Sequence, residues 1–308
     1  MGFLDDCQPY QRFRAERGLS FPDGPTTWYC IDWDQRRHIS IRVREEVTMG
    51  DDFSGCEAIT AMELIFRGLS GLVDRLDDDV YLVNFSMDGD FISASSDERD
   101  DEVLTTLYCP VEMIPEAYRN LKIVVSRADL VEVDRLSPGV DLVTYRSEPG
   151  SRAVFKYDFR HYRALRNWDE LNYWLRLTSE GHPSIVPFEW YRNDVEVVVG
   201  FTSAFVSSKT LQDLQKQPSW LFKKKYLEQL IDVVTHLNMD FGNVHRAIAP
   251  RNLLVNPATD TLQLFNFSRA RSLFLYDPIQ SQFSNTEGSD LDVKGVVATV
   301  YEIMASKE

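Results

Sequence analysis

The pattern of hydrophobic and polar positions along the first 120 residues predicts a small α/β region. Two segments rich in β-branched and aromatic residues, 27–33 and 38–43, flank a polar turn and are typical of a β-hairpin. Apolar residues recur at helical spacing over 54–76, and the apolar segment 80–85 predicts a further strand. The paired acids of this region lack the spacing of a metal site, so the pattern indicates no particular chemistry.

After residue 120 the pattern predicts a group of strands around one helix, followed by two longer helices. The strongest amphipathic pattern covers Ser219–Leu237, with Ser219 as the expected N-cap. An apolar helix is expected at Val293–Met304, where Gly295 would permit close helix packing. The remaining expected elements are strands at Leu130–Val133, Val140–Tyr145, Ala153–Tyr157, Val195–Val199 and Leu262–Phe265, and a helix at Trp168–Leu177.

Composition narrows the classes of function. The 308 residues are enough for roughly two domains, and 44% hydrophobic residues are typical of a globular protein. The formal net charge of −15 repels phosphate backbones and anionic lipids, so no nucleic-acid or membrane partner is expected. No segment has the length of a membrane span or the pattern of a signal sequence, and a cytoplasmic location is expected. The spacing of the cysteines predicts neither a zinc site nor a disulfide framework: Cys7, Cys30, Cys56 and Cys109.

The most specific motif lies between Val244 and Asn252. It reads Val-His-Arg-Ala-Ile-Ala-Pro-Arg-Asn and is followed by apolar residues that predict a short strand. This segment resembles the catalytic loop of protein kinases, whose pattern is His-Arg-Asp, four residues, Asn and a strand. Ala247 stands where that pattern has its aspartate.

The order of the expected elements also resembles the protein kinase-like superfamily from about residue 121. The resemblance implies an α+β, bilobal fold with an N-lobe over 121–206 and a truncated C-lobe over 207–308, preceded by the α/β region 1–120. The later helices that bind peptide substrates in the family are missing, which leaves open a fragment or a naturally minimal lobe. The phrases Ala-Pro-Arg-Asn and Asp-Val-Lys-Gly are similar to a divergent kinase-like group common in fungal genomes.

The resemblance assigns nucleotide-binding residues to the N-lobe. Lys156, in Ala-Val-Phe-Lys, matches the lysine that holds the α- and β-phosphates, and Glu170 matches its helix partner. Gly139 is the single glycine of a phosphate loop that has three in the family, which weakens the expected affinity for ATP. The expected hinge, 201–206, would offer backbone groups to an adenine ring and includes Phe201, Thr202 and Ala204. ATP therefore remains a possible cofactor.

Two departures from the family affect the chemistry. Ala247 has no carboxylate to accept the proton of a substrate hydroxyl, and loss of such a base costs on the order of 10²- to 10⁴-fold in rate. Asn266, in Asn-Phe-Ser, stands where the family has its magnesium-binding aspartate. An amide at Asn266, even beside the retained Asn252, is a weak ligand, so Mg²⁺ binding is doubtful. His245 is the other loop residue that is retained.

Two more motifs flank the loop. Asp290, five residues before Gly295, resembles the buried aspartate that braces the catalytic loop, and Asp292 is the alternative. The tripeptide Asp240–Gly242 spells the family's magnesium motif but precedes the loop. Gly242 is therefore expected to be a glycine with positive φ at a helix C-terminus.

Three hypotheses follow for function. The first is a non-catalytic kinase-like protein, a pseudokinase, that acts as a binding or regulatory module with an unidentified protein partner. The second is a weakly active protein kinase, or a small-molecule phosphotransferase of the same fold, that uses an acid from elsewhere. Asp260 is near in sequence, but its polar turn is expected to point away from the loop. The third is a decayed gene product without activity.

Overall fold

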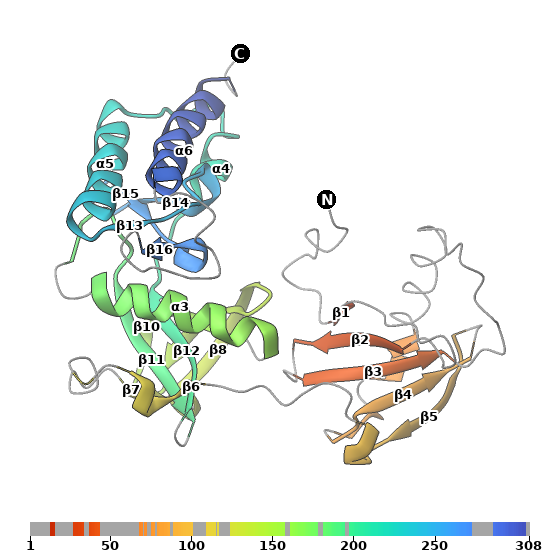
Figure 1. Ribbon diagram of the computed structural model, residues 1–308. Coiled ribbons are helices and arrows are strands. Elements are labelled where there is room, and N and C mark those ends of the chain that lie inside the picture. The colour runs from red at the N-terminus through yellow and green to blue at the C-terminus, as the bar shows by residue number, and fades with distance from the viewer. Residues whose placement is uncertain are drawn as a thin grey trace. The chain divides into compact units, whose positions relative to one another are not determined.

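The computed structural model is a mixed α+β structure that divides into two compact units (Figure 1). One unit comprises Met1–Leu107 and Arg135–Val140, and the other comprises Tyr108–Asp134 and Asp141–Glu308. The structure describes residues 13–15, 27–33, 37–43, 68–69, 71–72, 75–77, 79–86, 89–100, 109–114, 116, 124–157, 161–177, 181–194, 197–272 and 286–305.

The first unit contains a five-stranded sheet in the order β1-β2-β3-β4-β5. The expected hairpin is confirmed, because β2 and β3 pair antiparallel with Cys30 opposite Ile39. Strand β4 is parallel to β3, and β5 returns antiparallel to β4. Most of the expected helix 54–76 lies outside the described residues. The strands are β1 (Phe13–Ala15), β2 (Thr27–Asp32), β3 (Arg37–Val43), β4 (Leu82–Phe85) and β5 (Phe91–Ser95).

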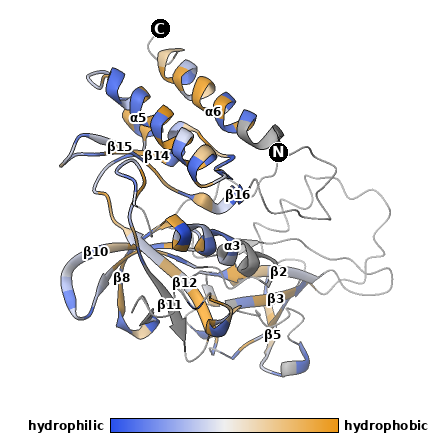
Figure 2. Ribbon diagram, turned by 60° about the vertical axis from the view of Figure 1, so that its left-hand side comes forward, coloured by the Kyte–Doolittle hydropathy of each residue, from blue (hydrophilic) through white to orange (hydrophobic). Residues whose placement is uncertain are grey.

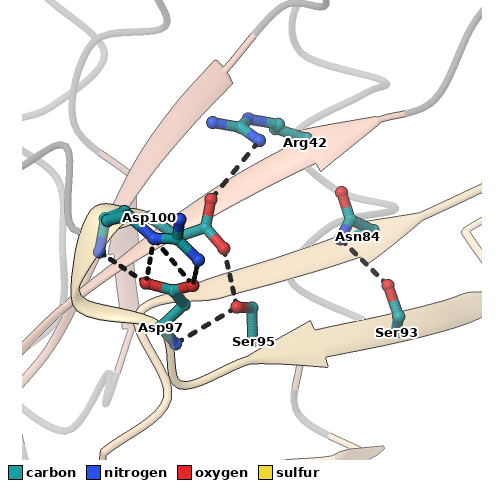
Figure 3. Close-up of polar contacts among 7 residues, drawn as sticks. Arg42, Asn84, Ser93, Ser95, Asp97 and Asp100 are labelled. Carbon is teal, nitrogen blue, oxygen red and sulfur yellow. Dashed lines mark hydrogen bonds and ion pairs between the residues drawn. The ribbon is translucent and has the colours of Figure 1, made fainter.

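Polar side chains fasten the end of β5 in the first unit (Figure 3). Ser95 Oγ donates to Asp100 Oδ2 at 2.6 Å, and Arg42 of β3 lies 3.9 Å from the other oxygen of that carboxylate. Asp97 accepts from the backbone N–H and the guanidinium of Arg99. These acids therefore take part in local turn contacts, as is usual for loop acids.

A second sheet has the order β7-β11-β12-β10-β9-β8, with β6 paired to β12, and all of it except Arg135–Val140 belongs to the second unit. Strand β6, at residues 109–110, pairs with β12 and lies before the expected boundary at residue 120. Strand β11, which mixes aromatic and charged residues, was not expected from the sequence. The strands are β6 (Cys109–Pro110), β7 (Val124–Ser126), β8 (Leu130–Ser137), β9 (Val140–Tyr145), β10 (Glu148–Tyr157), β11 (Phe188–Asp194) and β12 (Val197–Ala204).

Helix α3 (His161–Leu177) connects β10 to β11 and lies beside the sheet (Figure 1). It is longer than the expected Trp168–Leu177. Leu171, Trp174 and Leu175 are buried at helical spacing and form the face that packs into the core. Glu170 is also buried, on the same stretch of helix. Because burying a carboxylate is costly unless it is paired, a cationic or hydrogen-bonding partner is expected opposite Glu170.

The chain after β12 forms short helices, two small two-stranded sheets and a final helix. The elements are α4 (Leu211–Leu214), α5 (Lys224–Thr235) with a π-helical turn (His236–Asp240), β13 (Asn243–Val244) paired with β16 (Arg271–Ser272), β14 (Leu253–Asn256) paired with β15 (Thr261–Leu264), and α6 (Thr286–Ala305).

The expected N-cap at Ser219 is wrong. Helix α5 begins at Lys224, and Lys223 at the N-cap makes no side-chain cap hydrogen bond. The preceding segment is not helical. The Trp220 ring within it is parallel to that of Tyr226, with centroids 6.4 Å apart. The helix therefore starts at an aromatic contact and without a side-chain cap.

One hydrophobic core extends through the second unit. It joins the sheet to α5, the β14–β15 hairpin and α6, and includes Leu171, Trp174, Phe201, Leu230, Val234, Leu253, Leu264 and Ile303. Figure 2 shows that hydrophobic residues extend along α6. Several of these side chains are exposed: Val293, Val297, Tyr301 and Met304. Within the described residues, no helix combines the length and apolar character that crossing a membrane requires.

Candidate functional site

The loop 245–252 connects β13 to β14, and one buried carboxylate accepts hydrogen bonds from its backbone. Asp292 of α6 accepts hydrogen bonds from the backbone N–H groups of His245 and Arg246, each at 2.7 Å. Arg246 has φ +59°, a left-handed conformation that these bonds help to fix. The preference for Asp290 over Asp292 in the sequence analysis is therefore wrong. Residues two apart on a helix point roughly 200° from each other, and Asp290 is exposed while Asp292 is fully buried.

Helix α6 also touches the loop through Gly295. A Cβ at this position would lie 2.8 Å from Ile248 Cβ and 2.9 Å from Ile248 O. The expectation that Gly295 permits close packing is confirmed. The loop backbone is thus supported at two points of α6, once by a carboxylate and once by a close approach.

His245 is fully buried beneath the loop. Its Nε2 donates to the backbone oxygen of Phe265 at 3.0 Å, because a carbonyl can only accept. Burial lowers the pKa of His245 to about 4, so the imidazole is neutral near pH 7. A buried, neutral ring with its donor already engaged positions the loop and does not supply a proton acceptor at the surface.

An aromatic column connects this histidine to α3. The Phe267 ring makes edge contacts with His245 and with Trp174, at centroid distances of 4.8 Å each. Trp174 stacks in turn on Phe188 of β11 at 6.2 Å. No motif in the sequence predicted this column, although Phe267 follows Asn266 directly. Aromatic residues at single positions of four separate elements leave no periodic signal in the sequence.

A chain of polar contacts crosses the site. Lys156 Nζ of β10 lies 2.6 Å from Glu170 Oε2, so the expected ion pair is present. The same ammonium donates to Asn266 Oδ1 at 3.0 Å. Asn266 Nδ2 donates to Asn252 Oδ1 at 3.0 Å, and Asn252 Nδ2 donates to the Ala247 carbonyl at 2.7 Å. The predicted site residues Lys156, Glu170, Asn266, Asn252 and Ala247 therefore form one connected arrangement.

The local backbone explains how Asn266 reaches both partners. Its φ of 65° and ψ of 69° place it in the left-handed region, which asparagine tolerates better than most residues. It lies two residues after the end of β15 and directly precedes the turn Phe267–Arg269. The side chain thereby lies between Lys156 on one side and Asn252 on the other.

The charge balance of this chain is unfavourable for a divalent cation. Glu170 is paired with Lys156, and the next two groups, Asn266 and Asn252, are neutral amides. Mg²⁺ prefers anionic oxygen and gives up water reluctantly. Over the described ranges, no group of three or more His, Cys, Asp or Glu side chains is arranged to hold a metal ion.

Asp260 does not replace the carboxylate missing at Ala247. It lies in the turn of the β14–β15 hairpin and binds Lys223, Lys225 and Tyr226 near the start of α5. Asn252 and Asn266 flank the opposite, open end of this hairpin. Four residues of strand separate the two ends, which amounts to roughly 13 Å. The expectation that this turn points away from the loop is confirmed.

The expected hinge residues occupy positions that differ from the prediction. Phe201 and Thr202 lie within β12, between β10 and β11, so their backbone groups face neighbouring strands. Ala204 N donates to Pro187 O at 2.9 Å. The prediction that this stretch offers free backbone groups to a ligand is therefore wrong for these positions, because the strand continues to Ala204.

Gly139 occupies the two-residue turn between β8 and β9. Its φ is +75°, and Pro138 precedes it, a combination typical of a tight turn that needs glycine at its second position. This conformation accounts for the glycine without a phosphate. Its role in nucleotide binding stays a prediction.

The tripeptide Asp240–Gly242 has a structural role. Gly242 has φ +59° and directly follows Phe241, the C-cap of the π-helical turn, as expected for a glycine just past a helix end. Asp240 Oδ2 lies 2.6 Å from His236 Nδ1 within the same turn.

No protein-family model matches the chain.

Proposed function

We propose that the second unit is a protein kinase-like module with impaired catalysis, a pseudokinase, that acts by binding rather than by phosphoryl transfer. The observation that carries this proposal is the chain from Lys156 through Asn266 and Asn252 to the Ala247 carbonyl. It retains the positioning groups of a phosphotransferase site and lacks the acids that such chemistry uses. We place the module in the cytoplasm, with a protein as its partner.

The arrangement of the sheet supports a kinase-like, bilobal fold. Strands β8, β9, β10, β12 and β11 are neighbours in that order, and α3 is inserted between β10 and β11. Lys156 of β10 reaches Glu170 of α3, which matches the pairing implied by the resemblance. Asp292 of α6 supports the backbone of the loop. These features agree with one another although they come from distant parts of the sequence.

Two separate losses support impaired catalysis. At Ala247 no carboxylate can accept a proton, and Asp260 is held at the other end of the hairpin. At Asn266 an N–H group is directed to Asn252 Oδ1, so the two amides satisfy each other. The first loss alone costs on the order of 10²- to 10⁴-fold in rate. The second removes the anionic ligand on which Mg²⁺ depends.

Nucleotide binding in this proposal is weak and does not require a metal. Lys156 would have to exchange its bond with Asn266 for a phosphate oxygen. That exchange conserves the number of hydrogen bonds to the ammonium and leaves Glu170 paired. ATP is thus a candidate ligand without Mg²⁺.

A binding assay tests the proposal. The full chain is titrated with ATP in EDTA and then in Mg²⁺, with thermal unfolding and calorimetry as readouts. We expect similar weak binding in both buffers, reduced by Lys156→Ala and unaffected by Lys216→Ala, a surface lysine paired with Asp213. Transfer of phosphate from labelled ATP that Lys156→Ala abolishes would instead establish a weakly active kinase or a small-molecule phosphotransferase.

A restoration experiment examines the two losses together. In the double variant Ala247→Asp, Asn266→Asp we expect Mg²⁺-dependent ATP binding and measurable transfer to a generic protein substrate. Single variants should remain inactive, because each leaves one of the two acids missing. If the parent binds no nucleotide and the double variant also fails, the kinase-like assignment of this site is wrong.

A further inference from the structure

A pocket lies in the same unit, apart from the polar chain of Lys156. Its volume is about 160 Å³, and none of the residues of the polar chain lines it. Its walls are mostly apolar and include Trp174, Leu177, Ile185 and Phe188. A cavity of about 150 Å³ with apolar walls is large enough for benzene. The pocket therefore has the size and lining for one aromatic ring.

Two histidines supply the polar part of its lining. The rings of His182 and His236 are 4.8 Å apart with an angle of 30° between their planes. His182 Nδ1 accepts from Ser184 N, so in the neutral ring Nε2 carries the hydrogen and donates to Asp232 Oδ2 at 3.2 Å. Burial lowers the pKa of His182, and this ring is neutral near pH 7.

Each histidine is bonded to an exposed carboxylate. Asp232 of α5 contacts His182, and Asp240 of the π-helical turn contacts His236. The side chains of Asp232 and Asp240 are 73% and 64% exposed. The pocket thus combines aromatic walls with two negative charges one residue beyond its lining. The net charge of −15 on the whole chain has the same sign.

We propose that this pocket binds a small aromatic ammonium ion, with its ring against the apolar walls and its ammonium group toward Asp232 and Asp240. Aromatic faces attract cations, and the two carboxylates add direct Coulomb attraction. A carboxylate ligand of the same shape meets repulsion from both acids. This inference does not depend on nucleotide binding, because the residues involved are different.

Three ligands of equal shape test the charge preference. 2-Phenylethylamine, 2-phenylethanol and phenylacetate are titrated into the full chain at neutral pH, with calorimetry and protein NMR as readouts. We expect the amine to bind about three- to tenfold more tightly than the alcohol, and phenylacetate to bind most weakly. The double variant Asp232→Asn, Asp240→Asn should lose this preference. Asp213→Asn, another exposed carboxylate, is the matched control and should keep it.

The pH dependence gives a second readout. The titratable groups that face His182 are His236 of the π-helical turn and Asp232 of α5. Protonation of His182, whose pKa burial lowers, places positive charge beside the ligand, so affinity for the amine should fall as the pH is lowered through that pKa. The proposal is overturned if the alcohol or phenylacetate binds as tightly as the amine. It is equally overturned if the double variant, with an unchanged NMR fold signature, keeps the preference, or if none of the three binds at millimolar concentration.

Discussion

Asn266 and Asn252 are joined by a hydrogen bond of 3.0 Å from Nδ2 to Oδ1. The bond directs an N–H group at the oxygen that a divalent cation would need as a ligand. Asn266 Oδ1 accepts a hydrogen bond from Lys156 Nζ, and Asn252 Nδ2 donates one to the Ala247 carbonyl. The four residues satisfy one another without a ligand, so the arrangement is stable as an empty site.

This bond predicts the behaviour of Asn266→Asp. The new carboxylate would bring an acceptor oxygen against Asn252 Oδ1, and two acceptors facing each other cost about 1 kcal/mol or more. We expect a lower unfolding temperature in EDTA and recovery on addition of Mn²⁺, which the carboxylate and Asn252 can bind together. Thermal unfolding in the two buffers measures the effect. Asn266→Ala, which lacks both groups, serves as control and should not respond to Mn²⁺.

A second prediction separates Asp292 from Asp290. Asp292→Ala leaves the backbone N–H groups of His245 and Arg246 buried without partners, and we expect a loss of about 3 kcal/mol in the free energy of unfolding. Asp290→Ala removes an exposed side chain and should change stability by less than about 0.5 kcal/mol. Urea unfolding of both variants decides the matter. Equal effects at the two positions would contradict the assignment of the brace.

A third prediction concerns Gly295. Alanine is favoured over glycine in a helix by about 1 kcal/mol, but here its Cβ would lie 2.8 Å from Ile248 Cβ. Overpacking costs about 1–3 kcal/mol, so Gly295→Ala should be destabilising by about 1 kcal/mol. Gly150→Ala is the control, since nothing lies within 4 Å of a Cβ there. A stabilised Gly295→Ala variant would show that α6 does not press on the loop.

Much of the fold follows from local patterns in the sequence. The hairpin β2–β3 and strand β9 coincide with runs of β-branched and aromatic residues, because such residues suit a pleated, half-buried surface. The amphipathic pattern placed α5 correctly except for its start. The pair of Lys156 and Glu170 was also predicted, from the resemblance of Ala153–Lys156 and the following helix to the protein-kinase pattern.

Other features depend on the rotation of a helix about its axis and on side-chain packing, which local sequence patterns do not determine. Asp290 and Asp292 are chemically identical, and only the rotation of α6 decides which one is buried. Strand β11 mixes aromatic and charged residues without a regular alternation, and it pairs with β12 on one side and with β7 on the other. The bond between Asn266 and Asn252 needs the left-handed backbone of Asn266, which tertiary packing imposes.

His245 predicts how stability depends on pH. Burial holds its pKa at about 4 in the folded protein, below the value of about 6.5 in an unfolded chain. Between these values the unfolded chain binds a proton that the folded protein does not. The free energy of unfolding should therefore fall as pH falls from about 6.5 to about 4, by up to about 3 kcal/mol. Asp292, whose pKa burial raises, acts in the opposite direction, so the contribution of His245 is isolated by comparison with His245→Phe. This variant cannot take up the proton, and parallel pH profiles for variant and parent would contradict the prediction.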